Sequence, residues 1–229
     1  PEAFYNKGNA LLSLGDLIAF AEKIEQLTFV EAVERIAVFA GINVVKEQQS
    51  PQDKRKAQLM EHQLQCLQRA QEFFVSSLKA SDVAQSYLKV RQVNIDFSNR
   101  FELGYCESSQ RLLEYMKKHG FSDDILLSSG LFSRNERGLF CRFHQRLVFS
   151  IFDAQHRLLG FSGRVLSSDV QGAKYINSDE SAIFNKRRLL YGVHLAKKAI
   201  KDEGFVILVE GYMDVIICAQ FGLNNVVAC

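Results

Sequence analysis

Two carboxylates stand close together near the C-terminal end of the sequence, in the stretch VILVEGYMDV at residues 206–215. Glu210 directly follows an apolar run that is typical of a buried strand, and Asp214 comes four residues later, where a helix is expected. Gly211 permits a sharp backbone turn between them. Open parallel sheets bind ligands beyond the carboxyl ends of their strands, and carboxylates suit Mg²⁺. The stretch therefore favours a metal site, with acids that merely stabilise a helix N-terminus as the alternative.

A basic segment precedes the acidic pair. Residues 134–201 hold 13 Lys and Arg against 5 Asp and Glu, a net charge of +8 in a chain whose formal net charge is +2. Such a segment is typical of a surface that binds phosphate or nucleic acid, with a solvated charged surface as the alternative. Cations mixed with Tyr and Asn suit contacts to phosphate and sugar. The candidates for these contacts are Arg142, Arg146, Arg164, Lys174, Tyr175, Asn177 and Lys186.

Helices are expected to dominate the first part of the chain. Apolar residues at helical spacing predict two helices within residues 16–40, the second opened by a capping box of Thr28 and Glu31. Longer helical patterns follow at residues 54–79 and 82–91, after a polar linker.

Short strands are expected later. The alternation of apolar and polar residues in 94–107 predicts a strand and a turn, and residues 139–166 predict strands around a turn at 153–156. The last residues, from 205 to 229, have the pattern of a strand, a helix and a second strand. Such a βαβ unit implies parallel pairing.

The overall composition excludes several classes of protein. The chain is 47% hydrophobic and 24% charged, and no apolar run approaches the roughly 20 residues of a membrane span. Its five cysteines are odd in number and form no Cys-x-x-Cys pair, which argues against a disulfide framework and predicts a reducing, cytoplasmic location. The first residues have neither a start Met nor a basic signal-peptide region, so we expect an internal fragment with no membrane partner.

Residues 139–228 resemble the catalytic core of bacterial DnaG-type DNA primases. The resemblance is carried, in the family's order and spacing, by RFHQRLVFSIFD, GFSGRVL, AKYINSDESAIFNK, LLYG and VEGYMDV. VEGYMDV resembles the opening motif of the Toprim fold, and the basic pieces before it narrow the resemblance to primases. GDLIAFAEKIEQLTFVEAVERIA resembles, more weakly, the end of the primase zinc-binding domain and the helices after it.

The resemblance implies an α+β protein with an α/β Toprim start: a helical N-terminal segment, a mixed α/β basic subdomain and a truncated βαβ unit. The implied domains are the end or remnant of a zinc-binding domain at 1–45, a linker and helix at 46–80, the basic subdomain at 81–203 and the start of a Toprim domain at 204–229.

The implied activity is metal-dependent synthesis of short RNA primers on single-stranded DNA from ribonucleoside triphosphates. Glu210 and Asp214 would bind catalytic Mg²⁺ or Mn²⁺, with Glu210 and Lys186 as catalytic residues, and the basic candidates would line the nucleotide and template groove. A replicative helicase would bind a C-terminal region absent from this sequence, and we expect the fragment itself to be inactive because later acids are absent. A non-catalytic single-strand-binding module and another Toprim enzyme are the alternatives.

The sequence departs from the family in two ways. No Cys or His precedes His62, so this stretch cannot supply a tetrahedral zinc site, and Zn²⁺ is expected only if an intact zinc ribbon lies outside it or in its place. The family usually has Pro where Ser150 stands and Gly where Ser162 stands, and two extra residues fall between Arg164 and Lys174. We expect these differences to change loop stiffness more than chemistry.

Overall fold

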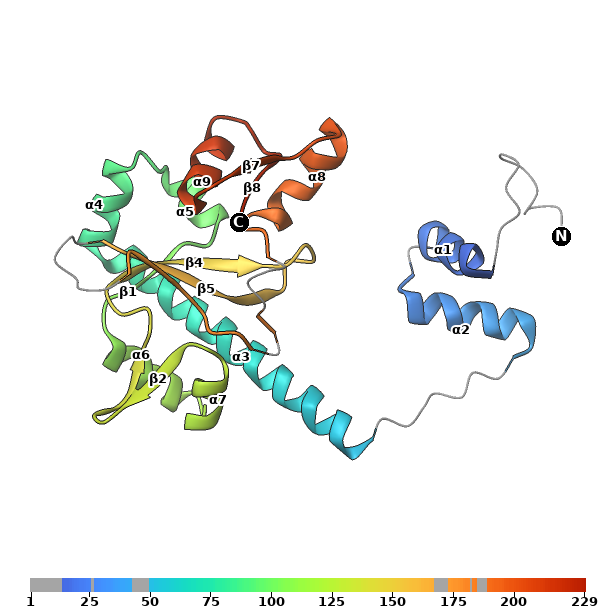
Figure 1. The fold of residues 1–229 in the computed structure, drawn as a ribbon, viewed down its shortest axis with the longest axis horizontal. Coiled ribbons are helices and arrows are strands. Elements are labelled where there is room, and N and C mark those ends of the chain that lie inside the picture. Colours follow the sequence, from blue (N-terminus) through green and yellow to red (C-terminus); the bar gives the residue numbers. More distant parts are fainter. Residues whose placement is uncertain (1–13, 26, 43–49, 167–172, 182, 185–188) are drawn as a thin grey trace. The chain divides into compact units, whose positions relative to one another are not determined.

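The computed structural model describes residues 14–25, 27–42, 50–166, 173–181, 183–184 and 189–229. The chain divides into two compact units, Pro1–Ser50 and Pro51–Cys229 (Figure 1). The domain boundaries predicted near residues 45, 80 and 203 stay predictions. Lys186 and residues 167–172, where the two extra residues before Lys174 are expected, lie outside the described residues.

The N-terminal unit contains two helices, α1 (Leu14–Ile24) and α2 (Phe29–Ala40). The predicted capping box is confirmed at the start of α2, where the Thr28 backbone N–H donates to Glu31 Oε2 at 2.7 Å and Thr28 Oγ1 accepts from the Glu31 N–H at 3.4 Å. Gly41 ends α2 in the left-handed conformation, which a residue without Cβ adopts at no steric cost.

The C-terminal unit is a mixed α/β structure. Its helices are α3 (Pro51–Ala80), α4 (Asp82–Val90), α5 (Ile95–Arg100), α6 (Ser109–Lys118), α7 (Asp123–Ser128), α8 (Val193–Glu203) and α9 (Tyr212–Gln220). Its strands are β1 (Gly104–Cys106), β2 (Phe132–Asn135), β3 (Gly138–Cys141), β4 (Arg146–Phe152), β5 (Leu158–Val165), β6 (Tyr175–Asn177), β7 (Ile207–Val209) and β8 (Val226–Ala228).

The described strands form three sheets. An antiparallel sheet has the order β1-β4-β5-β6, β2 pairs with β3, and β7 pairs with β8 in parallel. The predicted strand–helix–strand pattern at the end of the chain is therefore present, with α9 between the two parallel strands. None of the helices in the described ranges combines the length and apolarity that crossing a membrane requires.

Strand β4 separates two hydrophobic clusters, because its side chains point alternately to the two faces of the sheet. Leu147 and Phe149 belong to a cluster completed by α4, α9 and β8, whereas Val148 and Phe152 belong to a cluster completed by α3, α6 and α7. Figure 1 shows α3 passing along one face of the sheet, with α9, β7 and β8 on the other. We call these the α3 face and the α9 face.

A bulge in the hairpin of β4 and β5 sets which residues share a face. Phe152 is paired with Leu158, but Ile151 is paired with Gly160, so Leu159 is an extra residue on β5. The one-residue shift carries through the rest of the ladder. It pairs Arg164 with Leu147 rather than with Arg146.

The strand predicted within residues 94–107 is only partly correct. Residues Ile95–Arg100 form helix α5, and the strand is limited to Gly104–Cys106. Asn94 caps this helix through its side-chain oxygen, which accepts from the Asp96 N–H at 3.0 Å. The local capping bond outweighs the apolar alternation of so short a segment.

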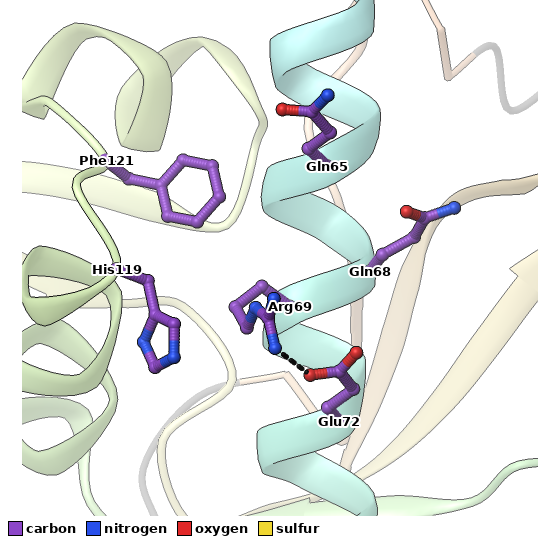
Figure 2. Close-up of a pocket in the computed structure, with 6 residues that line it drawn as sticks. All are labelled: Gln65, Gln68, Arg69, Glu72, His119 and Phe121. Carbon is purple, nitrogen blue, oxygen red and sulfur yellow. Dashed lines mark hydrogen bonds and ion pairs between the residues drawn. The ribbon is translucent and has the colours of Figure 1, made fainter.

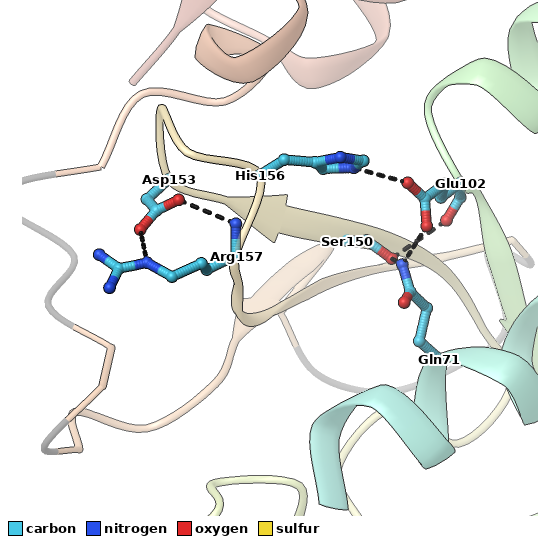
Figure 3. A network of polar contacts seen from close by, with 6 residues as sticks. All are labelled: Gln71, Glu102, Ser150, Asp153, His156 and Arg157. Atoms are coloured by element: carbon cyan, nitrogen blue, oxygen red, sulfur yellow. Dashed lines mark hydrogen bonds and ion pairs between the residues drawn. The ribbon is translucent and has the colours of Figure 1, made fainter. Parts of the chain in front are cut away.

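A polar network fixes the hairpin end of β4 against α3 (Figure 3). Gln71 Nε2 donates to Glu102 Oε2 at 2.6 Å and to Ser150 Oγ at 3.2 Å, and Ser150 Oγ donates to the Glu102 carbonyl at 3.1 Å. His156 Nε2 lies 2.9 Å from Glu102 Oε1. Ser150 and Ser162 both lie buried inside strands, so the expectation that they alter loops is wrong for these two positions.

We expect the buried side chain of His194, in α8, to make the free energy of unfolding depend on pH. Its ring stacks on His156, with centroids 4.9 Å apart, and neither of its ring nitrogens has a hydrogen-bond partner among the described residues. Burial, followed by the nearby charges of His156, Lys197 and Arg100, lowers the pKa of His194 from 6.5 to about 4, while Asp153 opposes the shift. The unfolded chain therefore binds this proton first as the pH falls.

We expect the free energy of unfolding to fall between about pH 6.5 and pH 4, by up to roughly 3 kcal/mol from this group. Urea unfolding at several pH values measures the fall. His194→Leu should flatten it, whereas His62→Leu, at an exposed helical position, should keep it. An unchanged pH dependence in His194→Leu would exclude His194 as its source.

Candidate functional site

The centre of the candidate site is a buried arginine. Arg164 lies on β5 between Leu147 of β4 and Tyr175 of β6, and cross-strand partners share a face, so its side chain is on the α9 face. Arg164 is only 6% exposed. Its Nε and Nη1 atoms have no hydrogen-bond partner, and it forms no ion pair, among the described residues. A buried cation without a carboxylate costs several kcal/mol, so the position suits an anionic ligand.

Aromatic rings flank this guanidinium. Arg164 Cζ lies 4.8 Å from the centroid of the Tyr87 ring and 5.7 Å from that of Tyr175. Burial raises the pKa of Tyr175, the cations of Arg164 and Arg91 lower it, the carboxylate of Asp214 raises it, and a hydrogen bond with the Arg164 side chain lowers it. Arg91 and Asp214 are therefore close enough to Tyr175 for their charges to act on it. The site gathers residues of α4, β5, β6 and α9.

The first residue of α9 fixes that helix on the sheet. The Tyr212 ring stacks on Tyr191, with centroids 4.5 Å apart, and lies edge-on to Phe149 at 5.6 Å. Burial raises the pKa of Tyr212, and a hydrogen bond with Ser162 opposes the shift. Ser162 is paired with Asn177, whose Oδ1 is buried without a hydrogen-bond partner in the described structure. The N-terminus of α9 therefore lies beside the β5–β6 residues.

The predicted acidic pair lies at this end of α9. Glu210 directly follows β7, and Asp214 is in the first turn of α9. Both side chains are exposed, and neither has a hydrogen bond or ion pair to another described residue. A Cβ on Gly211 would lie 2.8 Å from Asp214 Oδ2, so any other residue there would require the Asp214 carboxylate to shift.

The donor set at this end fits a hard divalent cation. Within the described ranges there is no group of three or more His, Cys, Asp and Glu that could hold a metal. Two carboxylates nevertheless suit Mg²⁺, which is commonly held by one or two carboxylates together with waters and phosphate oxygens. Glu210 and Asp214 therefore provide a partial set that a phosphate ligand would complete.

Two predicted cations do not join this group. Arg146 lies on the α3 face, where its Nη1 donates to the carbonyls of Ala173 at 3.0 Å and Lys174 at 3.3 Å. Burial lowers the pKa of Arg146. Arg142 forms an ion pair with Asp179 at 2.8 Å. Both arginines hold the segments around β6 rather than facing Arg164.

The other predicted residues have different surroundings. Tyr175 and Asn177 lie on the α9 face with Arg164, and Lys174 is exposed immediately before β6. Lys186 is outside the described residues, so its catalytic role stays a prediction. The sequence did not indicate Tyr87, Arg91 or Tyr212. The four-residue spacing of Tyr87 and Arg91 predicts contact on one helix, but nothing in it indicates that this helix meets β5.

A separate pocket lies between α3 and the segment that follows α6 (Figure 2). It has a volume of about 260 Å³ and is lined by Gln65, Gln68, Arg69, Glu72, His119 and Phe121. Arg69 Nη1 is paired with Glu72 Oε2 at 2.6 Å, so its charge is already compensated. Because α3 covers the opposite face of the sheet from Arg164, this pocket is distinct from the candidate site.

The two buried arginines should differ in their effect on stability. Arg146→Met removes the side-chain donor to the carbonyls of Ala173 and Lys174, of which Lys174 keeps the Val165 N–H, and should lower the free energy of unfolding by about 1–3 kcal/mol. Arg164→Met removes an unpaired buried charge and should leave the free energy of unfolding equal to or above that of the wild type.

Urea unfolding of both variants tests this contrast. Arg137→Met, at an exposed position before β3, is the control and should match the wild type. A larger loss in Arg164→Met than in Arg146→Met would contradict the assignment of unpaired and paired charges.

Comparison with known proteins finds similar sequences and structures. A family model described as the N-terminal domain of the DNA primase catalytic core matches residues 73–197. A DNA primase of Clostridium acetobutylicum is 36% identical over 216 residues, which cover 93% of this chain and 35% of that protein. The chain thus spans about a third of the length of this relative.

The fold of the chain is similar to those of solved structures, among them two primase structures. The zinc-binding and RNA polymerase domains of the Aquifex aeolicus primase align with a TM-score of 0.70 and 34% identity, over 93% of this chain and 51% of that one. A DnaG primase catalytic domain bound to single-stranded DNA aligns with a TM-score of 0.67 and 32% identity, over 75% of this chain and 56% of that one.

Proposed function

Because the chain belongs to the DNA primase family, we propose that it is the N-terminal part of a primase that copies single-stranded DNA into short RNA primers. The observation that carries the proposal is the buried guanidinium of Arg164, whose Nε and Nη1 have no hydrogen-bond partner among the described residues, together with the exposed acids Glu210 and Asp214 at the start of α9. A nucleoside triphosphate binds with Mg²⁺, so its site needs a cation for the phosphates and carboxylates for the metal. The relative bound to single-stranded DNA supports DNA as the template.

In this proposal the α9 face receives the phosphates. Arg164 donates N–H groups to phosphate oxygens, and the exposed Lys174 adds a second positive charge at the start of β6. The partly exposed ring of Tyr175 offers a surface for a sugar or base, and the unpaired Oδ1 of Asn177 accepts from a hydroxyl. Lys186 would join them from outside the described residues.

Arg146 and Arg142 have supporting roles. Arg146 binds the carbonyls of Ala173 and Lys174, so it holds the backbone that presents Lys174 and Tyr175. Arg142 holds the segment after β6 through Asp179. Direct contact of either arginine with nucleotide is therefore not part of the proposal.

Glu210 and Asp214 would hold Mg²⁺ or Mn²⁺ in the proposed site. A bound divalent ion would supply alignment of the attacking hydroxyl with the α-phosphate and neutralisation of developing charge. Glu210 directly follows β7 and Asp214 lies in the first turn of α9, so both acids are at the end of α9 that contacts Ser162 through Tyr212. The β7–α9–β8 unit would then be the start of a Toprim fold, and further acids, a zinc ribbon and a helicase contact stay predictions.

The first test changes one carboxylate in the full-length protein. Glu210→Gln should abolish primer synthesis on a single-stranded template while template affinity stays within about twofold, because the change removes a ligand charge and leaves the basic residues in place. Primer products and template binding are measured on the same preparation. Glu203→Gln, an exposed acid at the end of α8, is the control. Undiminished synthesis by Glu210→Gln would overturn the metal role.

The second test identifies the anion that Arg164 binds. If the anion is the template backbone, Arg164→Gln should reduce the slope of log affinity against log salt by about 0.7. If the anion is the triphosphate, the KM for ribonucleotides should rise by about tenfold and the template slope should stay unchanged. Arg137→Gln should change neither quantity. No effect of Arg164→Gln on either quantity would refute the anion site.

A further inference from the structure

Tyr87 connects helix α4 to the candidate site without carrying a charge itself. Its ring is the nearer of the two that flank Arg164, at 4.8 Å from Cζ, compared with 5.7 Å for Tyr175. Its hydroxyl accepts a hydrogen bond from Arg91 Nε at 3.1 Å. One side chain therefore contacts two of the cations at the site.

Tyr87 is itself firmly held. It is partly buried and packs against the hydrophobic cluster to which α4 contributes Ala84 and Leu88. Since α4 is capped by Ser81 and its buried side meets the α9-face core, the position of the ring is fixed by packing. The bond from Arg91 fixes its outer end.

A ring holds a guanidinium differently from a carboxylate. An arginine side chain has about 2 kcal/mol of rotamer entropy to lose, and a bidentate carboxylate would order it while occupying its N–H donors and cancelling its charge. An aromatic ring attracts the cation through its face and leaves the in-plane N–H groups free for a ligand. Arg164 shows this state, because Nε and Nη1 are unpartnered beside two rings.

We propose that Tyr87 is a positioning residue that holds the Arg164 guanidinium, with its Nε and Nη1 donors free, in the orientation that receives a phosphate oxygen. The inference rests on the proposed function, since Arg164 is the phosphate-binding group in it. The ring positions Arg164 and also lies 5.6 Å from Arg91 Cζ, whereas the hydroxyl bonds to Arg91 alone among the described residues. Tyr175 completes the arrangement from the β6 side.

The experiment compares two substitutions at position 87 in the full-length protein. Tyr87→Leu removes the ring, and Tyr87→Phe keeps it but removes the acceptor for Arg91. We measure the KM for ribonucleotides and the salt-dependent affinity for a single-stranded template. The variants are then compared in the binding, of nucleotide or of template, that Arg164→Gln weakens. Tyr87→Leu should weaken that binding by about 3- to 30-fold, the range of a desolvated cation–π contact. Tyr87→Phe should bind within about twofold of the wild type.

A matched control separates positioning from general loss of packing. Tyr115 on α6 is also a partly buried tyrosine, but it packs on the α3-face cluster. Tyr115→Leu should leave the same affinity within about twofold. Melting curves of all variants show that they are folded at the assay temperature.

The double variant gives the decisive result. If Tyr87 acts through Arg164, adding Tyr87→Leu to Arg164→Gln should cause no further loss of affinity. Additive losses, or a loss in Tyr87→Phe equal to that in Tyr87→Leu, would overturn the inference. If Arg164→Gln itself changes nothing, the proposed anion site fails first. If Arg164→Gln weakens binding and Tyr87→Leu does not, only the positioning role fails.

Discussion

The complete burial of β4 is the constraint on which the rest of the C-terminal unit depends. Every residue of this strand is buried, so both of its faces must be covered, and the structure provides a separate hydrophobic cluster for each. The long helix α3 completes one cluster and the α4, α9 and β8 elements complete the other. Because α9 and α4 are placed by the same cluster, the acidic pair and the Tyr87 ring reach the same side of the sheet.

The polar residues within this buried framework fall into two kinds. Arg146 and Ser150, on the α3 face, have their polar groups bonded to backbone or side-chain partners, as is usual for buried groups. Arg164 and Asn177, on the α9 face, have polar atoms without a partner in the part of the chain that the structure describes. Unsatisfied buried groups cost free energy, and they persist where a ligand or a mechanism needs them. For these four residues, Arg146 and Ser150 stabilise the fold, whereas Arg164 and Asn177 have atoms available to a ligand.

Local signals in the sequence predict much of this fold. The Thr28 capping box, the turn around residues 153–156 and the final strand–helix–strand pattern depend on neighbouring residues, and the structure contains all three. The helix at Ile95–Arg100 was mistaken for a strand because six residues carry little periodicity and a single cap at Asn94 decides the conformation.

The grouping of the site could be predicted only in part. The motifs predict that Arg164, Tyr175 and Asn177 bind nucleotide or template, and the structure brings these three to one face. The motifs predict the same role for Arg146, which lies on the other face. Which face an arginine takes depends on the strand register, and a bulge sets that register from residues outside the motif. The contribution of Tyr87 depends on a helix packing against a distant strand, for which one sequence carries no signal.

The bulge at Leu159 has a consequence for how this region can change in evolution or by engineering. Without the extra residue the pairing that starts at Phe152 and Leu158 would continue, and Arg164 would stand opposite Arg146 with both charges on one face. Single substitutions in the hairpin preserve the register, whereas the gain or loss of one residue between the turn and Gly160 exchanges the α3-face and α9-face residues of β5 together. The hairpin should therefore tolerate changes of residue type far better than changes of length.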